Sequence, residues 1–348
     1  MRRTLLRFIN RTLGALAIII IYLTGKGKNI FKLTSNRKIN RKKDFKNILL
    51  IKIIGIGDTV LMLPGIKRLK ERYPYAKITA LVTPISKGIL SDQPLLDEII
   101  VYDIFGKHTG IGGFIKIISL LNKKKFDLVI DYEQHIKLIT ILSHFTGAEK
   151  IIGFVNPDSN RGYLLTDRIM LDGNKHMVES FNELLLPLGI KSQPERLEKI
   201  KVSDKDTNYV NEWLQSQKIC SDDLLIGIHS GSGERALSRR WDKERYAAIG
   251  DRLIDEFQAK VIFTGSHSEI PLIRETARLM KNSPIISAGC TSLKQLVALI
   301  DRFDLFISND TGPMHIGPAM GTPTIGPKRP MDRLWEPRPL VFLVQMPP

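Results

Sequence analysis

Short apolar runs alternate with amphipathic stretches along most of the chain. The run NILLIKII at residues 47–54 is typical of a strand buried on both faces of a parallel sheet. Similar runs follow at residues 77–82, 98–103, 126–131 and 150–154. The helices predicted between them span residues 58–72, 112–123 and 136–146. Strand–helix alternation of this kind predicts a doubly wound parallel sheet.

The second half of the chain repeats this pattern. Its predicted strands span residues 224–230, 259–265, 284–289 and 303–310, and its predicted helices residues 242–257, 268–281, 292–302 and 312–320. Residues 155–200 carry few strand signals and one helix near 177–188, which indicates a connection between two domains. We expect two Rossmann-like α/β domains facing a central cleft, with ligands beyond the carboxyl ends of the strands. The predicted parts are an N-terminal extension at 1–46, domains at 47–175 and 201–348, and an interdomain connection at 176–200.

Charge is concentrated in the N-terminal extension. Of the net charge of +16, residues 1–46 contribute +12, with thirteen Lys and Arg residues and one acid. The apolar run at 13–23, LGALAIIIIYL, is shorter than the roughly 20 residues that a spanning helix needs, and no cleavage site of small residues follows it. The favoured interpretation is a helix lying on the inner membrane surface, held by its apolar face and by anionic lipid. The alternative is a terminal helix packed on the body, followed by a basic linker at 26–46.

Composition excludes several classes of protein. With 43% hydrophobic and 25% charged residues, the chain is globular. Its two cysteines, Cys220 and Cys290, are too few for a Cys₄ zinc site or a disulfide framework. The near-neutral body argues against a nucleic-acid-binding face. The sequence DKD at 204–206 has the form of a metal-binding DxD motif but lies in a polar linker, so we interpret it as a surface turn and expect no metal site.

The first candidate for chemistry is the sequence GIGD after the first strand. Gly55 and Gly57 let the backbone turn sharply, and Asp58 follows where a helix begins. Asp58 is either a helix N-cap or a carboxylate directed into the cleft as a general base. A dinucleotide fingerprint is not favoured, because Val60 stands where its third glycine would be.

Two further motifs favour phosphate. After residues 224–230 comes the small-residue loop 230–233, and then the bases Arg235, Arg239 and Arg240. Loop N–H groups and arginine forks can bind phosphate, although a flexible loop with solvated arginines is the alternative. The last motif, NDTGPMH, spans residues 309–315. Its helix N-terminus at Thr311 and Gly312 favours an anion, and with Asp310 and His315 it has the character of a nucleotide-diphosphate site.

The sequence NDTGPMHIGPAMGTPTIG closely resembles the signature of glycosyltransferase family 9, the heptosyltransferase-like enzymes of the bacterial lipopolysaccharide core. ILLIKIIGIGDTVLMLPGIKRLKERYP resembles the opening strand, loop and helix of that family. FDLVIDYEQHIKLITILSHFTGAEKIIGF and IGIHSGSG followed by SRRW fit in the same order. The resemblance covers about residues 47–335 and leaves out the extension.

The resemblance implies a GT-B fold with an N-terminal acceptor domain and a C-terminal donor domain. It implies an inverting, metal-independent transferase that moves a heptose from ADP-heptose to a lipopolysaccharide core or related lipid-linked glycan. No cofactor is implied beyond the nucleotide-sugar donor, and no nucleic acid. Such an enzyme would work in the cytoplasm, peripherally on the inner face of the cytoplasmic membrane.

The resemblance also implies residue roles, with Asp58 as the general base. The residues implied for the donor are Ser232, Arg239, Glu269, Thr291, Asp310, Thr311, Gly312 and His315. Among them Ser232 and Arg239 would contact the phosphates, Glu269 the ribose, and Thr291 the adenine. The chain departs from the family where Arg239 replaces a lysine and Asp242, after Trp241, replaces a proline, and the interval from Ser232 to Arg239 is long.

Three alternatives remain at the level of the sequence. One is a nicotinamide-dependent oxidoreductase, although the third glycine and the acid about 20 residues after it are missing. Another is a non-catalytic sugar-nucleotide-binding relative, in view of the short stretch after the last motif. The third is a GT-B transferase that uses a different nucleotide sugar.

Overall fold

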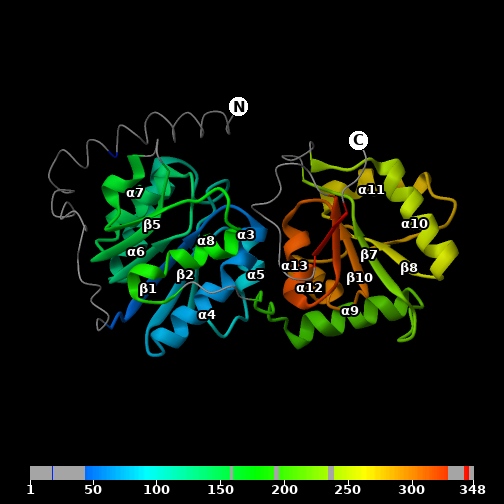
Figure 1. Cartoon of the computed structure of the whole chain (residues 1–348), viewed down its shortest axis with the longest axis horizontal. Coiled ribbons are helices and arrows are strands. Elements are labelled where there is room, and N and C mark those ends of the chain that lie inside the picture. Colours follow the sequence, from blue (N-terminus) through cyan, green and yellow to red (C-terminus); the bar gives the residue numbers. More distant parts are fainter. Residues whose placement is uncertain are drawn as a thin grey trace. The chain divides into compact units, whose positions relative to one another are not determined.

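The computed structural model describes residues 18, 44–156, 160–191, 196–233, 239–327 and 341–344. The chain forms two compact units (Figure 1). The first consists of Met1–Gly55, Met62–Lys87 and Pro94–Glu195, and the second of Ile56–Leu61, Gly88–Gln93 and Arg196–Pro348. Two short segments from the first half of the sequence therefore group with the second unit.

A six-stranded parallel sheet forms the centre of the first unit, in the order β3-β2-β1-β4-β5-β6. Its strands are β1 (Asn47–Lys52), β2 (Lys77–Val82), β3 (Glu98–Val101), β4 (Leu128–Asp131), β5 (Lys150–Val155) and β6 (Asp167–Met170). The five strands predicted in this half are confirmed, and β6 is additional. The buried side chains of β1 and β4, such as Leu49, Ile51 and Val129, form the core.

The described helices of this unit cover its sheet. They are α4 (Leu63–Arg72), α6 (Gly110–Lys123), α7 (Lys137–Phe145) and α8 (Met177–Glu183), with 3₁₀ turns at Asn160–Leu164 and Leu186–Leu188. Helix α5 (Pro84–Leu90) begins in this unit, and its last residues group with the second. The single helix predicted at 58–72 is wrong. It is two helices, α3 (Ile56–Leu61) and α4. The break has a physical reason, because Pro64 lacks an N–H and fits only the first turn of a helix.

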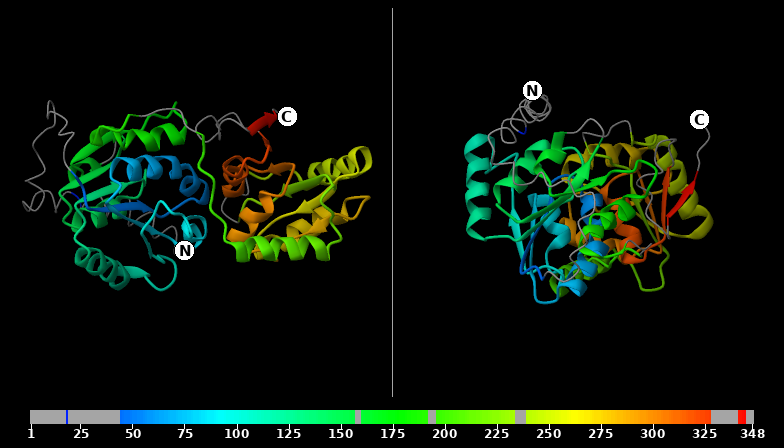
Figure 2. Two further views of the ribbon diagram at one scale, coloured as in Figure 1. Left: turned by 90° about the horizontal axis from the view of Figure 1, so that it is seen from below. Right: turned by 60° about the vertical axis from the view of Figure 1, so that its left-hand side comes forward.

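The second unit repeats the architecture with the strand order β12-β11-β10-β7-β8-β9 (Figure 2). Its strands are β7 (Leu225–His229), β8 (Lys260–Phe263), β9 (Ile285–Ile286), β10 (Leu305–Ser308), β11 (Thr324–Pro327) and β12 (Val341–Val344). Its helices are α9 (Asp204–Ser216), α10 (Lys243–Phe257), α11 (Ile270–Arg278), α12 (Leu293–Ile300) and α13 (Gly312–Met320), with a 3₁₀ turn at His267–Glu269. The four strands predicted here are confirmed, β9 in shortened form. Strands β11 and β12 were not predicted.

The surface turn predicted at residues 204–206 is also wrong. Asp204 and Asp206 lie in the first turn of α9, where the Ser203 hydroxyl accepts a hydrogen bond from the Asp206 N–H at 3.2 Å. A serine N-cap followed by acids is a strong helix start, since carboxylates near an N-terminus interact well with the helix dipole.

Most of the N-terminal extension, including nearly all of the apolar run at 13–23, lies outside the described residues. The membrane-surface helix therefore stays a prediction. Ile18 is described, and its side chain is buried against Ile141 and Leu164. At this one position the structure agrees with the alternative of a segment packed on the body. Of the helices in the described ranges, none has the length and apolar character to cross a bilayer.

Candidate functional site

The loop after β7 is a cradle of small residues in the second unit. Gly233 has φ +62°, a conformation that favours glycine, and a Cβ on Gly231 would lie 2.0 Å from Oε1 of Glu269. The Gly233 N–H donates to Glu269 Oε1 at 2.9 Å. The hydroxyl of Ser230 is buried and has no hydrogen-bond partner within the described residues. A buried, unpartnered hydroxyl in such a loop is suited to a ligand that supplies the missing hydrogen bond.

Asn309 joins this loop to the loop after β10. Its Nδ2 donates to the carbonyls of Ser230 and Gly231 at 2.8 and 3.3 Å. Its Oδ1 accepts from the Trp241 N–H at 3.0 Å and from the Tyr246 hydroxyl at 2.7 Å. The side chain is fully buried, so its hydrogen bonds hold four backbone and side-chain groups in one arrangement.

Helix α13 begins at Gly312, directly after this asparagine and Asp310. Thr311 is its N-cap but makes no capping hydrogen bond with its side chain. Pro313 has no N–H, and the Met314 N–H donates to the Thr311 carbonyl at 3.1 Å, so the N–H groups of Thr311 and Gly312 are the ones left for an anion. Beside them, Nη1 of Arg239 lies 3.2 Å from a carboxylate oxygen of Asp310 and 3.5 Å from its carbonyl oxygen. This half-exposed guanidinium brings a second source of positive charge to the start of α13.

His315, one turn into α13, is buried against α3. A Cβ on Gly57 would lie 2.3 Å from Cδ2 of His315, and one on Gly312 would lie 2.7 Å from Cβ of Ile56. Burial and the nearby positive charge of Arg239 lower the pKa of His315 to about 4, so the ring is neutral at pH 7. Its Nδ1 has no hydrogen-bond partner within the part of the chain that the structure describes.

Asp58 lies in the first turn of α3, immediately after Gly57, and its side chain is partly buried. Gly55 precedes this helix with φ +102°, a conformation that favours glycine. The start of the connecting loop is held by Glu133, whose Oε1 accepts from the N–H groups of Ile53 and Ile54 at 2.6 and 2.8 Å. A carboxylate after β4 thus fixes the backbone that leads to Asp58.

The remaining residues of the sequence prediction take different places. Oγ of Ser232 accepts from Nε of Arg240 at 3.0 Å, while Arg235 lies outside the described residues. Glu269 is buried, and its second oxygen accepts from the Ser266 N–H at 2.8 Å. Burial by itself raises the pKa of Glu269, but the neighbouring His229 and these hydrogen bonds hold it below the usual value.

The structure thus brings most of the predicted residues of the second unit together. Asp58, Gly57, Asp310, Thr311, Gly312 and His315 lie on or directly before the packed helices α3 and α13, and Arg239 joins them through Asp310. Ser232 and Glu269 belong to the loop after β7. Thr291 is connected to neither group by a described contact. Instead, it precedes Ser292, the N-cap of α12.

Sequence reasoning missed Asn309, Tyr246 and the hydroxyl of Ser230 as parts of this arrangement. The signal for Asn309 was an amide at the end of an apolar strand, next to an aspartate. Its partners come from residues 230–246, and no spacing rule along the chain connects them.

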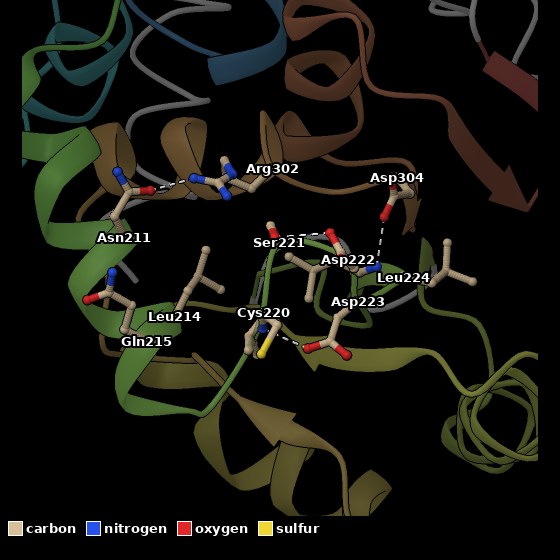
Figure 3. A pocket seen from close by; sticks show the side chains of 12 residues that line it. Asn211, Leu214, Gln215, Cys220, Ser221, Asp222, Asp223, Leu224, Arg302 and Asp304 are labelled. Atoms are coloured by element: carbon tan, nitrogen blue, oxygen red, sulfur yellow. Dashed lines mark hydrogen bonds between the residues drawn. The ribbon is translucent and has the colours of Figure 1, made fainter.

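A pocket of about 580 Å³ lies elsewhere in the second unit, near the amino ends of β7 and β10 (Figure 3). Several polar groups that line this pocket form hydrogen bonds with one another. Asp223 accepts from the Cys220 N–H at 2.7 Å, and Asp304 accepts from the Leu225 N–H at 2.8 Å. Ligands of open α/β sheets bind beyond the carboxyl ends of strands, so this pocket is not the candidate site.

The model of glycosyltransferase family 9 (heptosyltransferase) matches residues 114–329, which is more than half of the chain. The chain belongs to glycosyltransferase family 9. A lipopolysaccharide core heptosyltransferase, OpsX of Haemophilus influenzae, is 28% identical over 285 residues, covering 81% of this chain and 78% of that protein. Lipopolysaccharide heptosyltransferase 3 of Escherichia coli K12 is 28% identical over 281 residues, covering 77% and 78%. The protein is therefore a heptosyltransferase-like enzyme.

Solved structures support the GT-B fold of this family 9 enzyme. A family 9 glycosyltransferase from Veillonella parvula has a TM-score of 0.78 at 24% identity, covering 87% of this chain and 88% of that one. The E. coli ADP-heptose heptosyltransferase II has a TM-score of 0.72 at 24% identity, covering 86% and 90%. The predicted family and fold class are thus confirmed. Among the described residues of this enzyme, no three or more His, Cys, Asp or Glu side chains are grouped to hold a metal ion.

Proposed function

We propose that this enzyme transfers a heptose, with inversion, from ADP-heptose to a lipopolysaccharide core or related lipid-linked glycan. Asp58 is the general base in this proposal. The observation that carries it is the packing of Gly57 against His315, which brings the residue before Asp58 to the helix that begins with the NDTG motif.

The reaction in this proposal is one in-line displacement that needs no metal. Asp58 takes the proton from the acceptor hydroxyl while that oxygen forms its bond to the anomeric carbon. The bond from that carbon to the diphosphate breaks, and its electron pair leaves with the nucleotide. The developing charge is stabilised by Arg239, by the N–H groups at the start of α13 and by the loop 230–233.

Neutral His315 has a separate part in the proposal. Because its pKa is about 4, it meets the donor as an uncharged imidazole. Its unpartnered Nδ1 then hydrogen-bonds the donor, and so does the unpartnered hydroxyl of Ser230. Glu269 and Thr291 are proposed, from the family resemblance, to contact the ribose and the adenine. Glu269 can do so with the lone pairs that its backbone hydrogen bonds leave over.

The choice of ADP-heptose is supported by relatives. One solved neighbour is E. coli heptosyltransferase WaaC with ADP-2-deoxy-2-fluoro heptose, which has a TM-score of 0.67 and 16% identity and covers 86% of this chain and 93% of that one. We further propose that the enzyme works in the cytoplasm, on the inner face of the membrane, where residues 1–46 bind the lipid surface. Deleting residues 1–46 should shift part of the enzyme from the membrane fraction to the soluble one. An unchanged distribution would contradict a role of residues 1–46 in membrane binding.

The experiment that tests the function combines donor binding with transfer. ADP-heptose at about 100 times its Kd should stabilise the fold by roughly 2.7 kcal/mol, whereas UDP-sugars should not. Asp58→Asn should bind the donor nearly as well but lose about 10² to 10⁴ in kcat. Asp172→Asn, at an exposed ion pair with Lys175, is the matched control and should transfer normally. If only UDP-sugars stabilised the enzyme, ADP-heptose would be the wrong donor. If Asp58→Asn kept near-normal turnover, Asp58 would not be the general base.

A further inference from the structure

Helix α6 and the loop before it form a strongly basic stretch of the first unit. From Ile104 to Phe126 the sequence contains five lysines and no acid. Lys124 is paired with Glu98. The other four are exposed, and no ion pair joins them to another described residue: Lys107, Lys116, Lys123 and Lys125. The acids that flank the stretch are Asp103, whose Oδ2 accepts from the Lys107 N–H at 3.1 Å, and Asp127, which accepts from the N–H groups of Lys46 and Asn47. Four exposed lysines against these two carboxylates leave net positive charge on a body that is otherwise close to neutral.

The same stretch exposes large apolar side chains. Ile111 is 80% exposed, Ile115 is 58% exposed and Phe105, in the preceding loop, is 46% exposed. Ile111 and Ile115 are four residues apart, so they lie one turn from each other on one side of α6. The opposite side is filled by Ile117 and Leu121, which are buried in the core of the unit. The exposed isoleucines are thus not needed to attach α6 to its sheet.

We propose that this surface binds an anionic lipid bilayer. We call it the α6 face, and define it by Phe105, Lys107, Ile111, Ile115, Lys116 and Lys123. Exposed apolar side chains together with an excess of lysines are the combination that holds a helix in the interfacial plane of a membrane. A second copy of the same face would be repelled by its own charge, so a bilayer is the occupant that the charge favours.

The inference rests on the proposed function, because a lipid-linked acceptor is reached at a membrane. It adds a contact on the folded body, on the helix whose Phe114 packs against the cluster that contains Ile18. Two contacts on one chain raise the overall affinity beyond either alone. The α6 face makes no contact with the donor in this proposal, so its loss should leave the chemistry unchanged.

Sedimentation of the full-length enzyme with vesicles tests the α6 face. Binding should be much stronger to phosphatidylglycerol-rich vesicles than to phosphatidylcholine alone. The double variant Ile111→Ser/Ile115→Ser should bind anionic vesicles about tenfold more weakly, since it removes two inserting side chains. Lys107→Gln/Lys116→Gln should lose about fivefold per lysine at low salt.

Matched controls separate this surface from general charge and exposure. Lys218→Gln/Lys260→Gln removes the same charge from exposed positions of the second unit, and Tyr75→Ser removes a side chain that is 99% exposed. Both controls should bind like the parent. Equal vesicle binding by the control and α6-face variants would overturn the proposal.

A second measurement asks whether α6 itself reaches the lipid. Ile115→Trp should gain fluorescence that brominated phospholipid quenches. If this variant sediments with the vesicles but its tryptophan is not quenched by the brominated lipid, residues 1–46 bind the membrane alone. That result would overturn the proposal of the α6 face. Transfer to a detergent-dispersed acceptor keeps the two proposals apart. The α6-face variants should retain it, whereas a parent enzyme that binds vesicles but transfers no heptose would fail the proposed function only.

Discussion

The imidazole of His315 lies directly against the backbone of Gly57, although the two residues stand near opposite ends of the sequence. A Cβ on Gly57 would come within 2.3 Å of Cδ2 and 2.9 Å of Nε2 of that ring. The glycine before Asp58 is therefore required by the histidine of the NDTGPMH motif, and the two motifs are coupled by contact.

Gly57→Ala should accordingly displace α3 or the ring. Overpacking a buried site costs about 1–3 kcal/mol, and a shift of the residue before the proposed base should lower kcat more than it weakens donor binding. Urea unfolding and steady-state kinetics measure the two effects. Gly173→Ala, where an added methyl group meets open space, is the control and should change neither.

The double variant Gly57→Ala/His315→Ala shows whether the ring is the cause. Removing the imidazole makes room for the methyl group, so the two stability losses should sum to more than the double variant shows. Strict additivity would mean that the alanine clashes with something other than His315.

Asn309 should act as a positioning residue for the loop after β7. Asn309→Asp keeps the oxygen that accepts from Trp241 and Tyr246 but loses the donor to the carbonyls of Ser230 and Gly231. We expect donor affinity to fall about tenfold or more, because two buried hydrogen bonds worth roughly 0.5–1.5 kcal/mol each are lost and a carboxylate oxygen then faces two carbonyls. Calorimetric titration with ADP measures it.

Two further variants serve as controls for Asn309→Asp. Tyr246→Phe removes only the hydroxyl bond to Asn309 and should reduce stability by about 1 kcal/mol with donor affinity retained. Asn211→Asp makes the same amide-to-carboxylate change at a half-buried helix position that is hydrogen-bonded to Arg302, and it should leave ADP binding intact. If Asn309→Asp binds ADP as the parent does, the loop does not depend on this amide.

Much of the fold could be predicted because parallel strands buried on both faces are continuous apolar runs. That signal identified β1 to β5 and β7 to β10, with β9 shorter than predicted. It failed for β6, whose sequence DRIM alternates in burial, and for β11, TIGP, which is short and contains glycine and proline. Such strands are fixed by their neighbours in the sheet rather than by their own composition.

Residues of the site could be predicted from the sequence only where they stand next to one another in a single motif. Gly57 with Asp58, and Thr311 with Gly312, were visible as strand–turn–helix sequences. The contact of Gly57 with His315 and the four bonds of Asn309 join segments far apart in the chain, and no local pattern encodes them. The break between α3 and α4 was signalled by Pro64, which the amphipathic pattern of the surrounding residues concealed.

Stability should depend on pH through His315. Its pKa is about 4 in the folded enzyme and near 6.5 when unfolded, so the unfolded chain binds more protons between these values. The contribution of His315 to the free energy of unfolding is therefore fully present above pH 6.5. It is lost as the pH falls to 4 and amounts to on the order of 3 kcal/mol. Urea midpoints at pH 7 and pH 4.5 should differ less for His315→Gln than for the parent. His267→Gln, at an exposed histidine, should follow the parent, and a parent-like slope in His315→Gln would rule out this source.

Glu133 should position the loop that leads to Asp58, and its charge is compensated by Lys52. Both side chains are buried, and Nζ of Lys52 lies 3.5 Å from the oxygen that accepts from Ile53 and Ile54. Glu133→Gln leaves the lysine charge without its partner, and breaking a buried pair costs about 3–5 kcal/mol. Lys52→Met/Glu133→Gln removes both charges and should recover most of that loss.

In both variants the loop backbone is less firmly held, so kcat should fall while the Kd for ADP in the second unit stays unchanged. A parallel loss of ADP affinity would assign Glu133 a general structural role, and an unchanged kcat would show that the loop holds its conformation without this carboxylate.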